Sequence, residues 1–244
     1  MNQENSELYS SVQNFITLNQ DHIRAAIVDL DGTMVNTLGD FSAALNGMLQ
    51  ELQLPGIAAQ AIENMVGKGS EHLILSVLQK VLTETGEADV QAACKHFYPA
   101  AWAHYQTHYL AINGQFADVY PGVVEGLRAM QDRGWALACL TNKPTSFARP
   151  LLERKGLNVF FRHVFGGDAF ERKKPDPLPL LKTCEALGHL PAQTLMVGDS
   201  SNDAQAARAA GCPVVLVTYG YNHGEPIEAV DADGFVPSLA QLLL

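Results

Sequence analysis

The chain has 244 residues, of which 47% are hydrophobic and 17% charged, and these values are typical of a folded globular protein. Its net charge of −10 disfavours nucleic acid as a partner, because an acidic surface repels a phosphate backbone. We expect no signal peptide, because the first twenty residues hold no basic stretch before an apolar run. No apolar run is long enough to span a membrane, and the four cysteines form no metal-binding pair. We therefore expect a cytoplasmic monomer or homodimer that binds neither nucleic acid nor membrane.

The beginning of the chain predicts an extension followed by a buried strand. Residues 1–20 are polar with a weak apolar pattern, and we expect an N-terminal extension there. The apolar run at residues 25–28 then ends in Asp29 and Asp31. A short continuous apolar run of this kind predicts a strand buried on both faces, as in a parallel sheet.

The next segment, residues 38–115, has a different pattern. Its apolar residues recur at helical spacing, and no strand-like run with a polar end occurs in it. We expect an all-helical domain inserted after the first strand, which we call the helical cap.

Beyond the cap, apolar runs alternate with helical segments. The runs lie at residues 135–140, 164–165, 194–197 and 213–217, and the predicted helices at 121–133, 176–188 and 203–210. Strands that alternate with helices predict an α/β fold with a doubly wound parallel sheet. The core domain would comprise residues 21–37 and 116–244, and the helical cap residues 38–115.

Polar side chains follow the predicted strands. They are Asp29, Asp31, Thr141, Asn142, Asp199 and Asp203, with Lys174 in the loop before a predicted helix. Ligands of open α/β sheets bind beyond the carboxyl ends of the strands, so we expect these side chains to meet in one site. Clustered carboxylates repel one another unless a cation joins them, and Mg²⁺ suits such oxygen ligands beside a phosphate. The sequence therefore predicts a Mg²⁺ site at this edge of the sheet.

Four motifs in these positions resemble those of a known family. Residues 29–33 (DLDGT) resemble the first motif of the haloacid dehalogenase superfamily of phosphotransferases, and residues 140–143 (LTNK) resemble the second. Residues 174–175 (KP) are similar to the third motif and residues 198–203 (GDSSND) to the fourth. The four stand in the family's order across the whole core, and the helical cap matches the cap that the family inserts between its first two motifs.

The resemblance implies a role for each matching acidic residue. Asp29 would be the nucleophile that forms an aspartyl phosphate. Asp31 would donate a proton to the leaving group and then take one from the attacking water. Mg²⁺ would be held by Asp29, Asp199 and the backbone carbonyl of Asp31, and Asp203 would orient the metal site or Lys174.

The remaining motif residues would bind the phosphoryl group. Thr141 and Asn142 would donate hydrogen bonds to its oxygens, and Lys174 would neutralise their charge in the transition state. A loop of the cap offers a further candidate, since Lys68 stands between two glycines just before a predicted helix start that Ser70 would cap. We expect Lys68 to bind a second anionic group of the substrate.

Several further segments resemble the phosphoglycolate phosphatase branch of the family. They are residues 66–69 (VGKG), 119–122 (VYPG), 166–168 (GGD) and 218–226 (TYGYNHGEP). The resemblance implies a Mg²⁺-dependent hydrolase of a small phosphorylated metabolite, 2-phosphoglycolate above others. Two alternatives stay open, namely a phosphomutase of the same superfamily and a phosphatase with another small substrate. Halide removal is disfavoured because it requires neither an acid at Asp31 nor Mg²⁺.

Overall fold

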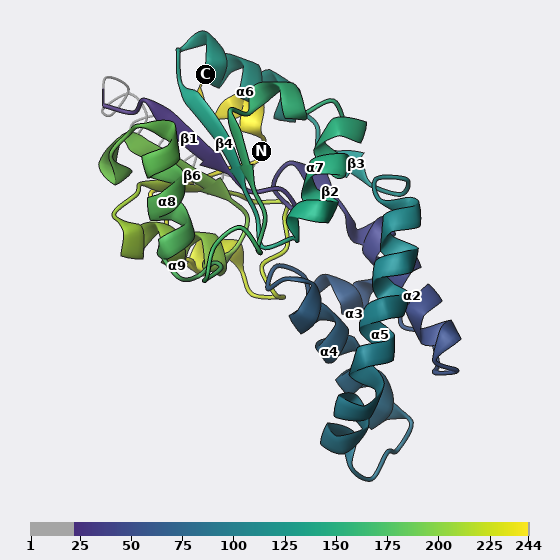
Figure 1. The fold of residues 1–244 in the computed structure, drawn as a ribbon. Coiled ribbons are helices and arrows are strands. Elements are labelled where there is room, and N and C mark those ends of the chain that lie inside the picture. Colours follow the sequence, from purple (N-terminus) through teal and green to yellow (C-terminus); the bar gives the residue numbers. More distant parts are fainter. Residues whose placement is uncertain (1–21, 244) are drawn as a thin grey trace.

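The computed structural model describes residues 22–243, and a six-stranded parallel sheet forms its centre (Figure 1). The strands are β1 (Ala25–Val28), β4 (Ala136–Leu140), β5 (His163–Phe165), β6 (Thr194–Gly198), β7 (Val214–Val217) and β8 (Gly234–Val236). Their order in the sheet is β5-β4-β1-β6-β7-β8, so β1 is central and the order reverses on either side of it. The carboxyl ends of β1, β4 and β6 therefore lie side by side, and this is the edge at which such sheets bind ligands.

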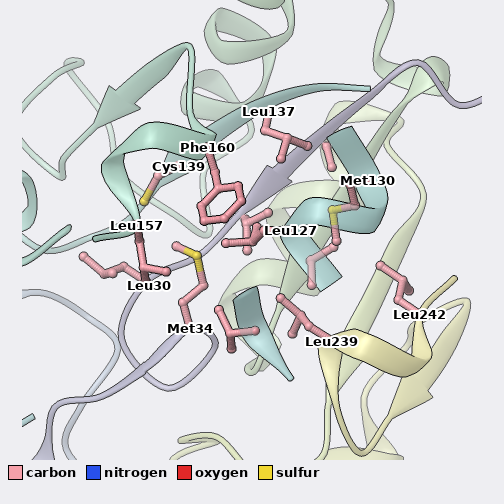
Figure 2. Packing of buried hydrophobic residues seen from close by; sticks show 14 of the residues in the cluster. Leu30, Met34, Leu127, Met130, Leu137, Cys139, Leu157, Phe160, Leu239 and Leu242 are labelled. Carbon is pink, nitrogen blue, oxygen red and sulfur yellow. The ribbon is translucent and has the colours of Figure 1, made fainter. Parts of the chain in front are cut away.

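Helices cover both faces of the sheet, and the alternation of side chains along each strand supplies the two faces. Ala26 and Val28 of β1 point to the face packed by α6 (Val123–Asp132) and α7 (Thr145–Arg154). Figure 2 shows Leu127 and Met130 of α6 in this cluster with Leu137 and Cys139 of β4. The opposite face, with Ala25 and Ile27, packs against α8 (Leu178–Leu187) and α9 (Ser201–Ala210). Because β1, β4 and β7 are buried along their whole length, each of these strands reads as an uninterrupted apolar run.

The helical cap is a second body with its own hydrophobic cluster. Its helices are α2 (Leu38–Glu51), α3 (Ala59–Glu63), α4 (Ser70–Glu84) and α5 (Val90–Ile112). Leu45 and Met48 of α2 and Ile74 and Leu78 of α4 belong to one hydrophobic cluster, which also includes Phe147 of α7 and differs from the two clusters of the sheet. A short antiparallel ribbon of β2 (Val35–Asn36) and β3 (Asp118–Val119) carries the chain into and out of the cap (Figure 1).

The predicted α/β sheet with inserted helices is confirmed, although several elements were not predicted. These are α7, β8, the β2–β3 ribbon, and the 3-10 helices Asn158–Phe160, Pro191–Gln193, Ile227–Ala229 and Leu239–Gln241. The prediction that Ser70 caps a helix is wrong: α4 begins at Ser70, its N-cap is Gly69, and no side chain caps it. The expected extension at residues 1–20 lies outside the described residues. Within residues 22–243, no helix has both the length and the hydropathy that a membrane span requires.

Candidate active site

The end of β1 places two aspartates at the entrance of a cavity. The N–H of Asp29 donates to the carbonyl of Val197 at 2.9 Å, so the neighbouring strand β6 fixes its backbone. Gly32 follows with a φ of +84°, and a Cβ at this position would collide with the carboxylate of Asp199. The glycine of the motif therefore allows the loop after β1 to approach the loop after β6. The carboxylates of Asp29 and Asp31 both line the same cavity.

The loop after β6 supplies two more aspartates, each held by several donors. Asp199 accepts hydrogen bonds from the hydroxyl of Thr33 at 2.9 Å and from the N–H of Tyr221 at 2.6 Å. One oxygen of Asp203 accepts from the N–H of Asp199 and from the N–H and hydroxyl of Ser200. One oxygen of Asp203 thus shapes the start of α9, whereas Asp199 is hydrogen-bonded to Thr33 in the loop after β1.

Lys174 joins the two pairs of aspartates. Its Nζ lies 2.6 Å from Asp203 Oδ1, 3.0 Å from Asp29 Oδ1 and 3.0 Å from the carbonyl oxygen of Leu140. Burial opposes the charge, but the carboxylates of Asp203 and Asp29 outweigh it and raise the pKa of the lysine. Lys174 is therefore a fixed cation beside the tip of β1.

Three carboxylates meet closely enough to share a metal ion. One oxygen each from Asp29, Asp199 and Asp203 lie within 4.8 Å of one another. Burial raises the pKa of Asp29 to about 7, despite Lys174, and burial together with Asp203 and Asp29 raises the pKa of Asp199 well above its usual range. Asp29 Oδ1 is buried and has no directed hydrogen bond within the described residues. A hard divalent cation with oxygen ligands fits this set, because it would satisfy Asp29 and relieve the repulsion.

Thr141 and Asn142 follow β4 on the same wall, but their side chains have different partners. The hydroxyl oxygen of Thr141 accepts a hydrogen bond from the N–H of Lys143 at 3.2 Å, and its own hydrogen can donate into the cavity. Both amide hydrogens of Asn142 are used, toward the carbonyls of Gly67 at 3.0 Å and Lys174 at 2.8 Å. The Asn142 amide is thus occupied by the protein in this arrangement, and the expected contact of Asn142 with the phosphoryl group stays a prediction.

The cap closes the cavity from the opposite side. Its lining residues there are Phe41, Val66, Gly67, Gly69, Ser70 and Leu73. Lys68 does not belong to this lining, although both flanking glycines do. Its side chain is exposed, and its charge contributes, after burial, to the lowered pKa of His72 and His223. The expected role of Lys68 in binding a substrate anion stays a prediction.

Two residues of the site received no role from the sequence. Tyr221 donates its N–H to Asp199, and its hydroxyl donates to Asn36 at 2.7 Å. It therefore connects the acidic cluster to strand β2, which leads into the cap. Lys143 is buried in the cavity wall and pairs with Asp31 at 2.9 Å. Both stand in segments that resemble the family, residues 140–143 and 218–226, but an aromatic residue or a lysine in a loop reads as ordinary surface until the fold buries it.

The fold and the site together define an α/β enzyme with an acidic centre at its strand ends, covered by helices. The sequence profile of the family "Haloacid dehalogenase-like hydrolase" matches residues 26–217. The chain belongs to this family.

Relatives of known sequence and structure agree with this assignment. The chain is 44% identical to a phosphoglycolate phosphatase of Thiobacillus denitrificans, over 91% of this chain and 95% of the relative. It is 42% identical to a phosphoglycolate phosphatase of Nitrosospira multiformis, over 89% and 92%. A crystal structure of a "predicted phosphoglycolate phosphatase" from Haemophilus somnus superposes with a TM-score of 0.84 and 32% identity, over 91% of this chain and 96% of that one.

Proposed function

We propose that this protein is a Mg²⁺-dependent phosphomonoester hydrolase of small organic phosphates, with 2-phosphoglycolate as its best substrate. The observation that carries the proposal is the placement of Asp29. Its buried Oδ1 stands 3.0 Å from the ammonium of Lys174 at a strand end, in a cavity shared with Asp31 and Thr141. The relatives named phosphoglycolate phosphatase support 2-phosphoglycolate as the substrate.

The first step transfers the phosphoryl group to the protein. A carboxylate oxygen of Asp29 attacks phosphorus, and the bond from phosphorus to the ester oxygen breaks. Asp31 gives its proton to that oxygen, so the alcohol leaves neutral. Lys174 and the hydroxyl of Thr141 stabilise the charge on the phosphoryl oxygens.

The second step restores the protein. Asp31, now a carboxylate, takes a proton from a water molecule that attacks the phosphorus of the aspartyl phosphate. The bond from phosphorus to Asp29 breaks, and inorganic phosphate forms. Asp203 takes no part in bond making, but its contact of 2.6 Å keeps the ammonium of Lys174 beside Asp29.

The residues fit Mg²⁺, which Asp29, Asp199 and the backbone carbonyl of Asp31 would hold. Bound there, the ion supplies charge that offsets the repulsion between an anionic nucleophile and an anionic substrate. Thr33 and Tyr221 orient Asp199 for this role by donating to its two oxygens at 2.9 and 2.6 Å.

The cap side of the cavity is lined by apolar side chains, namely Phe41, Val66 and Leu73. The core side would bind the phosphoryl group of any ester, so the cap would choose the leaving group. The cytoplasmic setting and the state as monomer or homodimer stay predictions of the sequence.

A phosphate-release assay over a panel of small phosphate esters, with and without Mg²⁺, tests the proposal. We expect Mg²⁺-dependent release of phosphate with the highest kcat/KM for 2-phosphoglycolate. Transfer of phosphate between positions of a sugar phosphate, without net release, would instead identify a mutase. Absence of turnover on every ester would contradict the proposal.

A further inference from the structure

Lys143 is a buried cation whose side chain faces the cap side of the cavity. It follows Asn142 directly after β4, and its side chain is 2% exposed. Its Nζ lies 2.9 Å and 3.2 Å from the two oxygens of Asp31. Burying an ammonium group is costly unless it is paired, and Asp31 supplies that pairing here.

The surroundings of Lys143 differ from those of the other buried lysine. Lys174 already contacts two carboxylates and a carbonyl oxygen. Within residues 22–243, Lys143 contacts a single carboxylate, and its Nζ lies 4.4 Å from the ring centre of Phe41 and 4.6 Å from that of Tyr109, both in the cap. Aromatic faces hold a cation in place without neutralising it. Lys143 can therefore accept a further anion beside Asp31, whereas Lys174 lies beside Asp29, where the phosphoryl group would bind.

The opposite wall of the cavity also suits an anion. Helix α4 begins at Ser70, and its N-cap is Gly69, which has no side chain to offer the first N–H groups. Gly69 and Ser70 line the same cavity as Lys143. The amino end of a helix carries unpaired N–H groups and a partial positive charge, and both favour a negative group.

The chemistry of the leaving group brings these features together. In the proposed mechanism Asp31 protonates the ester oxygen, so the leaving group lies next to Asp31 and hence next to Lys143. In 2-phosphoglycolate a single methylene separates that oxygen from the carboxylate carbon. A carboxylate so close to Asp31 lies within reach of the ammonium at 2.9 Å from Asp31.

We propose that Lys143 is the specificity-determining residue that binds the carboxylate of the substrate, while Lys174 serves the phosphoryl group. This inference rests on the proposed function, because it assigns the second anion of the same substrate. It competes with the prediction that Lys68 binds this anion. Lys68 is exposed and outside the cavity lining, whereas Lys143 is inside it.

The test compares two esters that differ in one group. 2-Hydroxyethyl phosphate replaces the carboxylate of 2-phosphoglycolate by a neutral hydroxymethyl group. Lys143→Met should lower the ratio of their kcat/KM values by about tenfold to a hundredfold, the range for losing a hydrogen bond to a charged group. Lys143→Gln, which is neutral but can still donate to Asp31, should lower the ratio similarly. Lys143→Arg should keep most of the preference.

Matched lysines control for charge and for the competing site. Lys95→Met removes an exposed lysine of the cap and should leave the ratio unchanged. A selective loss in Lys68→Met, with none in Lys143→Met, would overturn the proposal in favour of the loop. An equal loss of both esters in Lys143→Met and Lys143→Gln would also overturn it, since Lys143 would then only position Asp31.

Measurements of ligand affinity distinguish a failure of this proposal from a failure of the proposed function. In an Asp29→Asn background, calorimetry measures the affinity for each ester without turnover. Tighter binding of 2-phosphoglycolate that disappears on adding Lys143→Met supports the carboxylate site, even if wild-type protein hydrolyses neither ester. Equal affinity for the two esters would overturn it, even if both are hydrolysed.

Discussion

The two walls of the cavity are built on different principles. The core wall presents charged groups that are fixed by ion pairs, since Lys174 pairs with Asp29 and Lys143 pairs with Asp31. The cap wall consists of apolar side chains, two glycines and a helix start, with Phe41 and Tyr109 holding the ammonium of Lys143 through their ring faces. A rigid charged wall suits a reaction that is the same for every phosphate ester. The cap wall has few polar groups and belongs to a separate domain. It can therefore discriminate between leaving groups without changing the groups that bind phosphate.

The largest loss of activity should follow from replacing Asp29, the proposed nucleophile in the core wall. Asp29→Asn cannot form an acyl phosphate, so kcat should fall by more than about 10³-fold while the protein stays folded. Steady-state kinetics and a thermal melt measure both properties. Asp132→Asn changes an exposed aspartate of α6 and should be neutral. Near-normal activity of Asp29→Asn would show that Asp29 is not the nucleophile.

Removal of the metal should have the next largest effect. Exhaustive chelation should reduce phosphate release to background, and Mg²⁺ should restore it. Ca²⁺ should restore it poorly, because it takes more ligands at longer distances than the octahedral Mg²⁺. Full activity in the presence of a chelator would show that the carboxylates of the core wall work without a metal.

Replacing Asp203, which holds Lys174 in place, should lower activity less than replacing the nucleophile. Asp203→Asn keeps the shape of the side chain but removes the charge that lies 2.6 Å from the ammonium, so kcat should fall by about 10–100-fold. Asp231→Asn removes an exposed partner of Arg208 at 3.0 Å and serves as the control for losing an ion pair. Equal behaviour of the two variants would show that Lys174 holds its place without Asp203.

The raised pKa of Asp29 makes metal binding depend on pH. The pKa of Asp29 is about 7 without metal, so below pH 7 its carboxyl is protonated and must lose the proton when Mg²⁺ binds. The affinity for Mg²⁺ should therefore weaken as pH falls, by about tenfold per pH unit below 7 if one proton is released. Calorimetry in buffers of different ionisation enthalpy measures this proton. The same affinity at pH 6 and pH 8 would contradict the prediction.

The smallest effect should come from the contact between the two walls. Asn142 and Asn202 both donate toward the carbonyl of Gly67, at 3.0 Å and 3.4 Å. If they only hold the cap loop against the core, each alanine variant should lower kcat/KM by about fivefold to tenfold, as expected for one or two neutral hydrogen bonds. A much larger loss for Asn142→Ala than for Asn202→Ala would indicate that Asn142 contacts the substrate as well.

The sequence by itself determined the sheet and the identity of the residues at its carboxyl edge. Buried parallel strands must be apolar throughout, so β1, β4, β6 and β7 were visible as runs that end in polar residues. The peripheral strand β8 was not predicted. The helix α7 was also not predicted, although its buried residues lie at helical spacing.

Only the tertiary structure decided how these residues are paired. The amide of Asn142 could donate to any oxygen, and the fold gives it Gly67 and Lys174 instead of leaving it to the cavity. Ser70 reads as a helix cap, yet the helix begins one residue earlier than that role allows, because Gly69 takes the capping position. Lys68 and Lys143 cannot be distinguished in the sequence, but in the fold Lys68 is exposed and Lys143 is buried. Partners distant in sequence set the surroundings of each side chain, and local spacing carries no information about them.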